Sequence, residues 1–135
     1  MAIPLHCIML VDDDRDDNFL HVRAIRRSGV DVKIIVKTSG REALEYLKST
    51  SKGDVIHPDL IFLDINMHEM NGWGFLKEYN KLDHALQSRT IVIMLSTSDY
   101  ELDKARARQW SFVYDYIVKP LSQEKMTSIV KEYFS

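Results

Sequence analysis

The sequence predicts an α/β fold, a doubly wound parallel sheet with helices on both faces. Five short runs rich in Ile, Val and Leu alternate along the chain with five segments of helical periodicity. Several of the runs are apolar at every position, as strands buried on both faces of a parallel sheet are. Right-handed crossovers between such strands place the helices on the two faces of the sheet. The residues that follow each strand then meet at one edge, where folds of this class bind ligands.

The strands are expected at the apolar runs, which are bounded by turn residues or charged residues. Cys7 lies within the first run, and we interpret it as an unreactive packing residue. The five expected strands are Leu5–Val11, Val32–Thr38, Leu60–Leu63, Ile91–Leu95 and Tyr114–Val118.

Each helix is indicated by apolar residues three or four positions apart or by a capping residue at its start. A Ser followed three residues later by Glu predicts a capping box, in which the two residues satisfy backbone N–H groups at the helix start. The expected helices are residues 15–28, a helix capped by Ser39 and Glu42, a helix through Phe75, Leu76, Tyr79 and Leu82, a helix capped by Ser98 and Glu101, and a last helix that begins after Ser122 and continues to Tyr133.

Length and composition limit the function classes. The chain has 135 residues, 45% of them hydrophobic and 28% charged, which is ordinary for one globular domain. Its 18 basic and 20 acidic residues give a net charge of −2, which does not favour binding to nucleic acid or to anionic membranes. One cysteine cannot form an internal disulfide, and the start of the chain lacks the basic region expected of a signal peptide. We therefore expect a single cytoplasmic domain over residues 1–135, without an output domain.

Acidic, hydroxyl and lysine side chains follow the strands. Carboxylates 4 Å apart repel by roughly 4 kcal/mol at an effective dielectric near 20, so they need protons or a cation between them. Mg²⁺ suits such oxygen donors. A divalent metal, a lysine, a hydroxyl and a carboxylate able to attack are the groups needed for phosphoryl transfer onto aspartate. These residues are Asp12, Asp13 and Asp14 after the first strand, Asp64 after the third, Ser96 and Thr97 after the fourth and Lys119 after the fifth.

Other interpretations of the acidic run fit less well. It imitates the start of a calcium-binding loop, but Asp17 and Arg23 stand where that loop needs Gly and Glu. A flavin-binding carrier of this fold would want a Ser/Thr/Gly-rich phosphate loop in place of these acids. Asp12 and Asp14 also match the Asp-x-Asp of haloacid-type phosphatases, but the chain has no insertion for a cap domain.

Four motifs together resemble the receiver domain of response regulators, the aspartate-phosphorylated proteins of two-component signalling. The motifs are LVDDD at 10–14, LDINMHEMNGW at 63–73, MLSTS at 94–98 and YIVKP at 116–120. The resemblance extends from Leu5 to the end of the chain. It implies a flavodoxin-like (βα)5 fold with strand order 2-1-3-4-5.

The resemblance also implies a role for each residue of the site. The phosphoacceptor is Asp64, and Mg²⁺ is held by Asp12, Asp13, Asp64 and the backbone carbonyl of Asn66. Lys119, joined to Pro120 by a cis peptide, pairs with the phosphoryl group, and the backbone N–H of Thr97 donates to it. Ser96 is the switch hydroxyl, and Tyr116 is the aromatic residue that changes rotamer with it.

The implied function is a phosphorylation-dependent switch rather than a conventional enzyme. Its phosphodonor is a sensor histidine kinase or a phosphotransfer protein, and its output is partner binding or relay of the phosphoryl group. The DDDRDDNFL and NGWGFL segments are similar to the small receivers of phytochrome-type and hybrid sensor kinases. The alternative is a receiver-like interaction module that is not phosphorylated. The presence of Asp12, Asp13, Asp64 and Lys119 argues against that alternative.

Some of the aromatic residues near the end of the chain must face the core, but as a group they indicate an interface. They lie beside a charged helical segment, a composition typical of interfaces. We expect a homodimer through the helix after the fourth strand, the fifth strand and the last helix. The aromatic residues are Trp110, Phe112, Tyr114, Tyr133 and Phe134.

His68 departs from the family pattern, which usually has proline at this position. A histidine frees the backbone and restores an N–H group, and a titrating side chain there would make the phosphoryl lifetime depend on pH. We interpret it as a solvent-exposed loop residue. Four other histidines show no metal-binding spacing and are interpreted as structural or solvent-exposed: His6, His21, His57 and His84.

Overall fold

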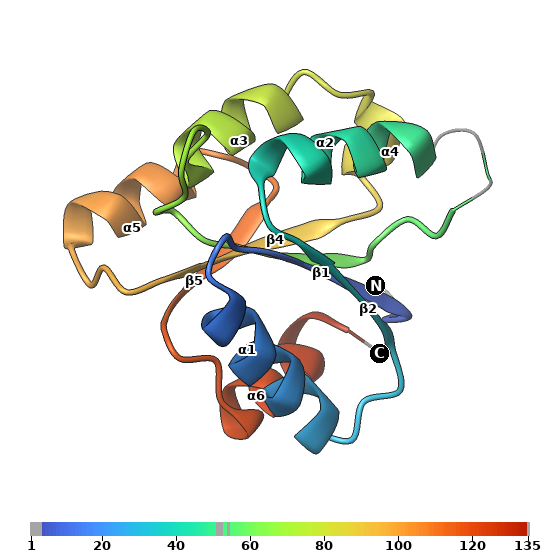
Figure 1. The fold of residues 1–135 in the computed structure, drawn as a ribbon, viewed down its shortest axis with the longest axis vertical. Coiled ribbons are helices and arrows are strands. Elements are labelled where there is room, and N and C mark those ends of the chain that lie inside the picture. The colour runs from blue at the N-terminus through green and yellow to red at the C-terminus, as the bar shows by residue number, and fades with distance from the viewer. Residues whose placement is uncertain (1–3, 51–52, 54, 135) are drawn as a thin grey trace.

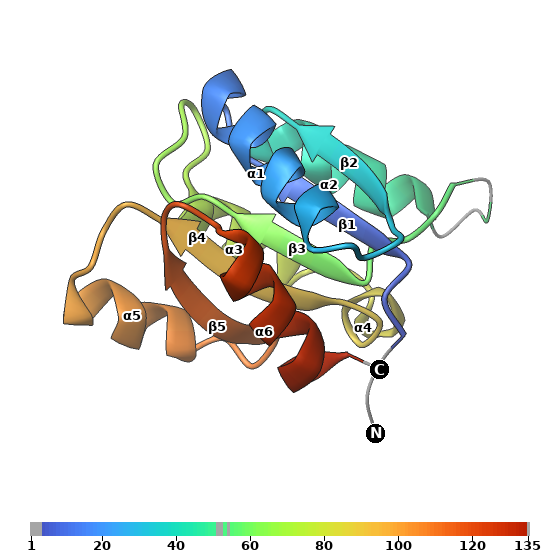
Figure 2. The same ribbon diagram turned by 90° about the horizontal axis from the view of Figure 1, so that it is seen from below.

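The structure, a computed structural model, describes residues 4–50, 53 and 55–134. Five strands form one parallel sheet in the order β2-β1-β3-β4-β5, with helices on both sides (Figure 1). Figure 2 shows the strand arrows pointing toward the same edge. The predicted fold class and the strand order implied by the resemblance are therefore confirmed. The strands are β1 (Cys7–Val11), β2 (Lys33–Lys37), β3 (Leu60–Leu63), β4 (Ile91–Ser96) and β5 (Val113–Val118).

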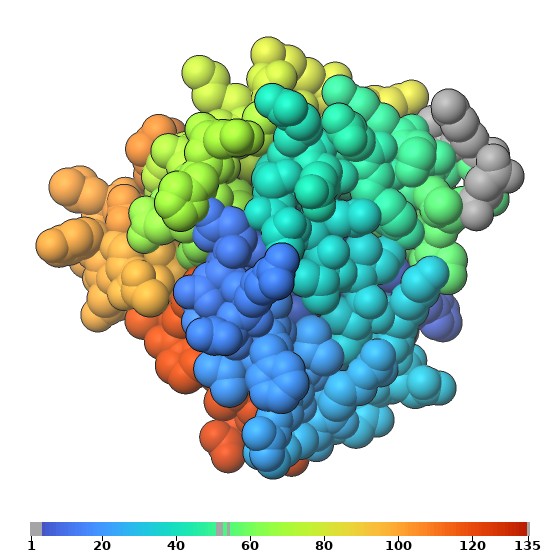
Figure 3. All heavy atoms as spheres, in the orientation of Figure 1, coloured from blue at the N-terminus to red at the C-terminus, as the bar shows by residue number. Residues whose placement is uncertain are grey.

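The helices form two layers. α2, α3, α4 and α5 lie on one side of the sheet, and α1 and α6 lie side by side on the other (Figures 1 and 2). The space-filling view shows the start of α1, in blue, against the loop between β3 and α3, in yellow-green (Figure 3). The helices are α1 (Arg15–Arg27), α2 (Gly40–Ser49), α3 (Gly72–Tyr79), α4 (His84–Gln87), α5 (Glu101–Arg108) and α6 (Gln123–Tyr133).

Alternation of side chains along the strands divides the core into two clusters. On β1, Ile8 and Leu10 pack with α1 and α6, whereas Met9 and Val11 pack with α2 and α3. β1, β3 and β4 are buried at every position, as the continuous apolar runs predicted. These three strands are therefore packed from both faces of the sheet.

Some element boundaries differ from the prediction. β1 begins at Cys7 rather than Leu5, because the Asp59 carboxylate accepts the N–H groups of His6 (2.8 Å) and Cys7 (3.1 Å). β5 begins at Val113, one residue earlier than predicted. A shift in its register with β4, between Val92 and Ile93, accommodates the change. α4 was not predicted. It is a single turn capped by Asp83, too short to show helical periodicity.

The caps were predicted well at two helices and wrongly at a third. The hydroxyls of Ser39 and Ser122 each accept a backbone N–H at the start of α2 and α6. The prediction of a capping box at Ser98 is wrong. α5 begins at Glu101 with Tyr100 at the N-cap position, and the Ser98 hydroxyl instead donates to Asp103 at 2.5 Å. Of the helices described, none is both long and apolar enough to cross a bilayer.

Candidate functional site

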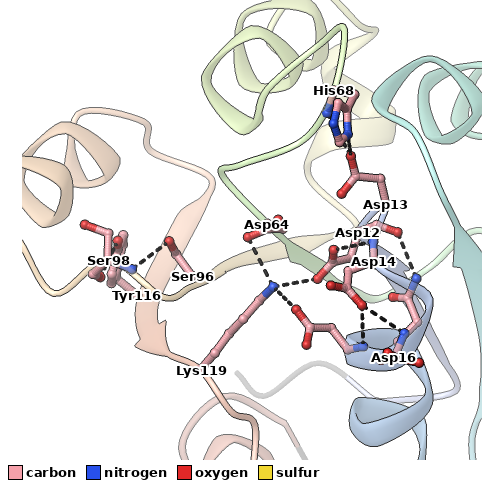
Figure 4. A network of polar contacts seen from close by, with 12 residues as sticks. Asp12, Asp13, Asp14, Asp16, Asp64, His68, Ser96, Ser98, Tyr116 and Lys119 are labelled. Carbon is pink, nitrogen blue, oxygen red and sulfur yellow. Dashed lines mark hydrogen bonds and ion pairs between the residues drawn. The ribbon is translucent and has the colours of Figure 1, made fainter.

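The acidic residues after β1 and β3 meet at the carboxyl edge of the sheet (Figure 4). Val11 and Leu63 are register partners in neighbouring strands, so Asp12 and Asp64 leave the sheet side by side. Carboxylate oxygens of Asp12, Asp13 and Asp64 lie within 4.8 Å of one another. The juxtaposition expected from topology alone is therefore present.

Lys119 enters this cluster from the end of β5. Its Nζ lies 2.7 Å from Asp12 Oδ2, 2.7 Å from Asp17 Oδ2 and 3.4 Å from Asp64 Oδ1. Burial alone would lower the pKa of Lys119, but the bonds to Asp12 and Asp17 raise it well above its usual range. Lys119 is therefore a permanent cation at this edge. Its peptide bond to Pro120 is cis, as the resemblance implied.

Asp17 was not predicted as part of the site. It lies in the first turn of α1, after Asp14, whose side chain caps the helix by accepting the N–H groups of Asp16 and Asp17. An acid in a first helical turn normally needs no partner, because the helix dipole favours it. The sequence could have indicated Asp17 only through the placement of α1 at the carboxyl edge.

Asp64 is the carboxylate most affected by its surroundings. It is 5% exposed. Burial raises its pKa from near 3.8 to about 6, and the charge of Asp12 adds to the effect. Lys119 and the backbone N–H of Asn66 oppose the rise without cancelling it. The ionised form of Asp64 is therefore held at a cost in free energy.

Asp13 is held from the opposite side by the loop between β3 and α3. The backbone N–H of His68 donates to Asp13 Oδ2 at 2.8 Å, and His68 Nδ1 lies 2.7 Å from the same oxygen. The backbone hydrogen bond is the first cause that lowers the pKa of Asp13. His68 is exposed, as expected, but the prediction missed its contact with Asp13.

Asn66 and Thr97 line the same open pocket as the aspartates and Lys119, and both are exposed. Ser96, the residue before Thr97, is fully buried. Its Oγ accepts the N–H of Ser98 at 3.1 Å, and its backbone carbonyl accepts the N–H of Lys119 at 2.7 Å. The Ser96 hydroxyl is thus already bound to the following loop, and the Ser96 backbone is bound to Lys119.

Tyr116 lies beside the same loop, away from the acidic cluster (Figure 4). Its hydroxyl donates to the backbone carbonyl of Ser98 at 2.8 Å, and its ring is half-buried. The two predicted switch residues, Ser96 and Tyr116, are therefore both hydrogen-bonded to Ser98. Their predicted roles remain predictions.

The remaining residues singled out from the sequence have structural roles or lie at the surface. Cys7 is buried, which raises its pKa to about 11 and makes it a poor nucleophile. His21 is buried, and His6 and His84 are exposed. His57 joins two loops at the other end of the sheet through Thr50 Oγ1 (2.8 Å) and Thr90 Oγ1 (2.7 Å).

Comparison with known proteins agrees with this geometry. The family model of the response regulator receiver domain matches residues 8–131. The chain belongs to that family. Receiver domains are signalling modules of two-component systems that interact with histidine kinases or phosphotransfer proteins, and they are not conventional enzymes.

Known receiver proteins resemble this one at moderate identity. The probable methanogenesis regulatory protein FilR2 of Methanothrix harundinacea (strain 6Ac) is 30% identical over 125 residues, which are 93% of this chain and 79% of that protein. A two-component response regulator from Cytophaga hutchinsonii is 29% identical, with a TM-score of 0.86 over 96% of both chains. The phosphorylated cyanobacterial phytochrome response regulator RcpA is 32% identical, with a TM-score of 0.75 over 94% of this chain and 89% of that one.

Proposed function

We propose that this receiver domain is a phosphorylation-dependent signalling switch and that Asp64 is its phosphoacceptor. The proposal rests on the surroundings of the Asp64 carboxylate. It is a buried carboxylate with a pKa raised to about 6, next to a lysine and two other carboxylates. An acid in a pocket whose pKa is shifted by burial together with a specific charged neighbour is a candidate functional residue.

The residues around Asp64 fit a magnesium ion. Mg²⁺ is held by hard oxygen donors, usually one or two carboxylates completed by waters and phosphate oxygens. Asp12, Asp13 and Asp64 supply three such carboxylates, and the single charge of Lys119 leaves the cluster negative. We assign these three side chains and the backbone carbonyl of Asn66 as the ligands. When bound, the ion would neutralise charge on the transferring phosphoryl group.

The transfer is a displacement at phosphorus. An oxygen of Asp64 forms a bond to the phosphorus of a phosphohistidine, the P–N bond breaks, and its electron pair remains on the imidazole of the donor. Lys119 pairs with an oxygen of the incoming group, and the Ser96 hydroxyl and the Thr97 N–H donate to the others. The protein is itself the acceptor, so it catalyses only its own phosphorylation and the later hydrolysis.

The switch couples Ser96 to Tyr116. To reach a phosphoryl oxygen, the Ser96 hydroxyl gives up the N–H of Ser98, which it accepts at 3.1 Å. Ser98 also accepts the Tyr116 hydroxyl through its carbonyl. Movement of this loop therefore frees the Tyr116 ring and changes the surface formed by α5, β5 and α6.

Exposed apolar residues on α1 support docking of a phosphodonor protein on this helix. Phe19 and Leu20 on α1 are 65% and 50% exposed. Leu20 and Leu121 line a groove that continues to Pro120, the neighbour of Lys119. A helix of a histidine kinase or phosphotransfer protein in this groove would bring its phosphohistidine to Asp64. The similarity to RcpA supports a phytochrome-type kinase as the first donor to test.

The surface of α5, β5 and α6 supports the proposed homodimer. Tyr114 is 51% exposed and packs edge-on against Tyr133, with ring centroids 5.8 Å apart. Leu102 on α5 is 85% exposed. The homodimer is tested by measuring the molar mass by light scattering, with and without beryllium fluoride, an analogue of the phosphoryl group. A monomer mass in both states contradicts the dimer.

Intact mass after incubation with acetyl phosphate and Mg²⁺ tests the main proposal, with Asp64→Asn as the control. We expect a gain of one phosphoryl group that requires Mg²⁺ and is absent in the variant. Labelling that survives Asp64→Asn means that the acceptor is another residue. If the folded wild type gains nothing from acetyl phosphate or from a kinase, the non-phosphorylated interaction module becomes the better description.

A further inference from the structure

The contact between His68 and Asp13 is absent from a receiver with proline at this position. Both hydrogen bonds fall on one oxygen, Asp13 Oδ2, at 2.8 Å from the backbone N and 2.7 Å from Nδ1 of His68. A proline has no N–H group and no imidazole, so it could make neither bond. Figure 4 shows Asp13 between His68 and the other aspartates.

The backbone donor is held in place by the loop and not by the exposed ring. The N–H of Gly72 closes the loop onto the Ile65 carbonyl at 2.8 Å. A Cβ at Gly72 would lie 2.6 Å from the Asp64 carbonyl oxygen, so only glycine allows this closure. Glu69 has a φ of 64°, a left-handed conformation that turns the chain directly after His68. The His68 N–H is therefore directed at Asp13 by the backbone.

We propose that His68 is a positioning residue for the cation site and that it acts by fixing the Asp13 carboxylate. Because His68 occupies Oδ2, Oδ1 is the oxygen left for the ion, and the carboxylate loses its freedom to rotate. Mg²⁺ requires nearly ideal octahedral geometry, whereas Ca²⁺ accepts irregular coordination. A fixed Asp13 therefore favours Mg²⁺ over Ca²⁺. This inference depends on the proposed function only in taking Mg²⁺ as the ion.

The test is calorimetric titration of the unphosphorylated protein with Mg²⁺ and, separately, with Ca²⁺. His68→Pro removes both bonds, His68→Ala keeps the backbone N–H, and His68→Asn returns a side-chain donor. His84→Ala, a change of an exposed histidine outside the site, is the matched control. We expect Mg²⁺ to bind about tenfold more weakly to His68→Pro, the low end of the range for loss of a ligand's hydrogen-bond partner. His68→Ala should lie between His68→Pro and wild type, with His68→Asn closer to wild type than His68→Ala.

The ratio of the Mg²⁺ and Ca²⁺ affinities distinguishes loss of Asp13 positioning from general damage to the loop between β3 and α3. The proposal requires His68→Pro to weaken Mg²⁺ binding several times more than Ca²⁺ binding. An Mg²⁺ affinity within twofold of wild type, or an equal loss for both ions, overturns it. If His68→Pro does not fold, His68→Ala decides, and an unchanged Mg²⁺ affinity in that variant overturns the proposal.

Failure of this inference and failure of the proposed function give different results. A wild type that is labelled at Asp64 while all His68 variants bind Mg²⁺ equally well contradicts only the role of His68. A wild type that is never labelled, but whose Mg²⁺ affinity depends on His68, contradicts only the phosphoacceptor assignment.

Discussion

The Tyr116 hydroxyl donates a hydrogen bond to the backbone carbonyl of Ser98 at 2.8 Å, and this bond joins β5 to the loop after β4. The same Ser98 donates its N–H to Ser96, the residue at the end of β4. A change at Ser96 therefore reaches the Tyr116 ring through one intervening residue. This short connection gives the proposed switch a physical basis.

Tyr116→Phe removes only the hydrogen bond from the Tyr116 hydroxyl to the Ser98 carbonyl. The variant should therefore favour the conformation in which the ring of residue 116 is released. A neutral hydrogen bond contributes about 1 kcal/mol, which corresponds to about a fivefold shift between two ring positions. We expect the variant to bind beryllium fluoride up to about fivefold more tightly than wild type, because less energy is needed to release the ring. Tyr114→Phe, on the same strand, is the control. Equal affinities in wild type and Tyr116→Phe would show that the bond does not oppose switching.

Asp64→Asn should stabilise the protein when Mg²⁺ is absent. The pKa of Asp64 is raised to about 6, so its ionised form destabilises the folded state above that pH. Asparagine removes the charge, and we expect the free energy of unfolding to increase by up to about 3 kcal/mol at pH 8. The gain should shrink as the pH falls through 6, because the folded protein then binds a proton at Asp64. Urea melts in EDTA at several pH values measure this, and a gain that does not depend on pH would contradict it.

Lys119→Met should destabilise the folded protein, which is the opposite of the effect expected for Asp64→Asn. The change leaves Asp12, Asp17 and Asp64 without the ammonium that lies 2.7 to 3.4 Å from them. Removing one partner of a buried ion pair costs about 3–5 kcal/mol, and the open pocket puts this case at the lower end. Added Mg²⁺ should recover more stability in Lys119→Met than in wild type. Lys131→Met, at an exposed position of α6, is the control, and identical melts of both variants in EDTA would refute the prediction.

His57 should make the stability sensitive to acid. Burial, with help from Arg89, lowers its pKa, so the unfolded chain binds a proton near pH 6.5 before the folded protein does. The contribution of His57 to stability is therefore present above pH 6.5 and is lost as the pH falls. In the Asp64→Asn background, which removes the opposite titration of that residue, His57→Gln should reduce the loss of stability between pH 7.5 and 5.5. His84→Gln serves as the control, and a loss unchanged by His57→Gln would argue against this role.

The sequence predicted most of the fold because its signals are local. Continuous apolar runs identified the buried strands, and Ser39 and Ser122 marked helix starts through hydrogen bonds to residues three positions away. The same rule failed at Ser98, whose hydroxyl found a stronger acceptor in Asp103. α4 was missed because one helical turn has no period to detect.

The site was predictable only where strand order determines it. Asp12, Asp64 and Lys119 meet because their strands end at one edge of the sheet. The contacts of Asp17 with Lys119 and of His68 with Asp13 depend on helix placement and loop conformation, which sequence periodicity does not encode. The left-handed Glu69 shows the difficulty, since glycine or asparagine would be expected at such a turn.

Leu20→Ser should separate docking of a phosphodonor protein from the chemistry at Asp64. Leu20 is half-exposed in the groove beside Pro120, and it is not among the described residues that line the pocket of the acidic cluster. Truncating a residue that anchors an interface costs about 1 kcal/mol or more. We therefore expect transfer from a kinase or phosphotransfer protein at limiting concentration to fall about fivefold or more. Labelling by acetyl phosphate, which needs no docking surface, should not change.

Leu102→Ser is the matched control, because Leu102 is also an exposed leucine but lies on α5. Its rate of transfer from the protein donor should equal that of wild type. Equal losses in the two variants would mean that the donor also contacts α5. A loss of acetyl phosphate labelling in Leu20→Ser would mean that the change disturbs the acceptor pocket itself, because α1 carries Asp17 close to Lys119. Only a loss confined to the protein donor and to Leu20→Ser supports the groove as the docking surface.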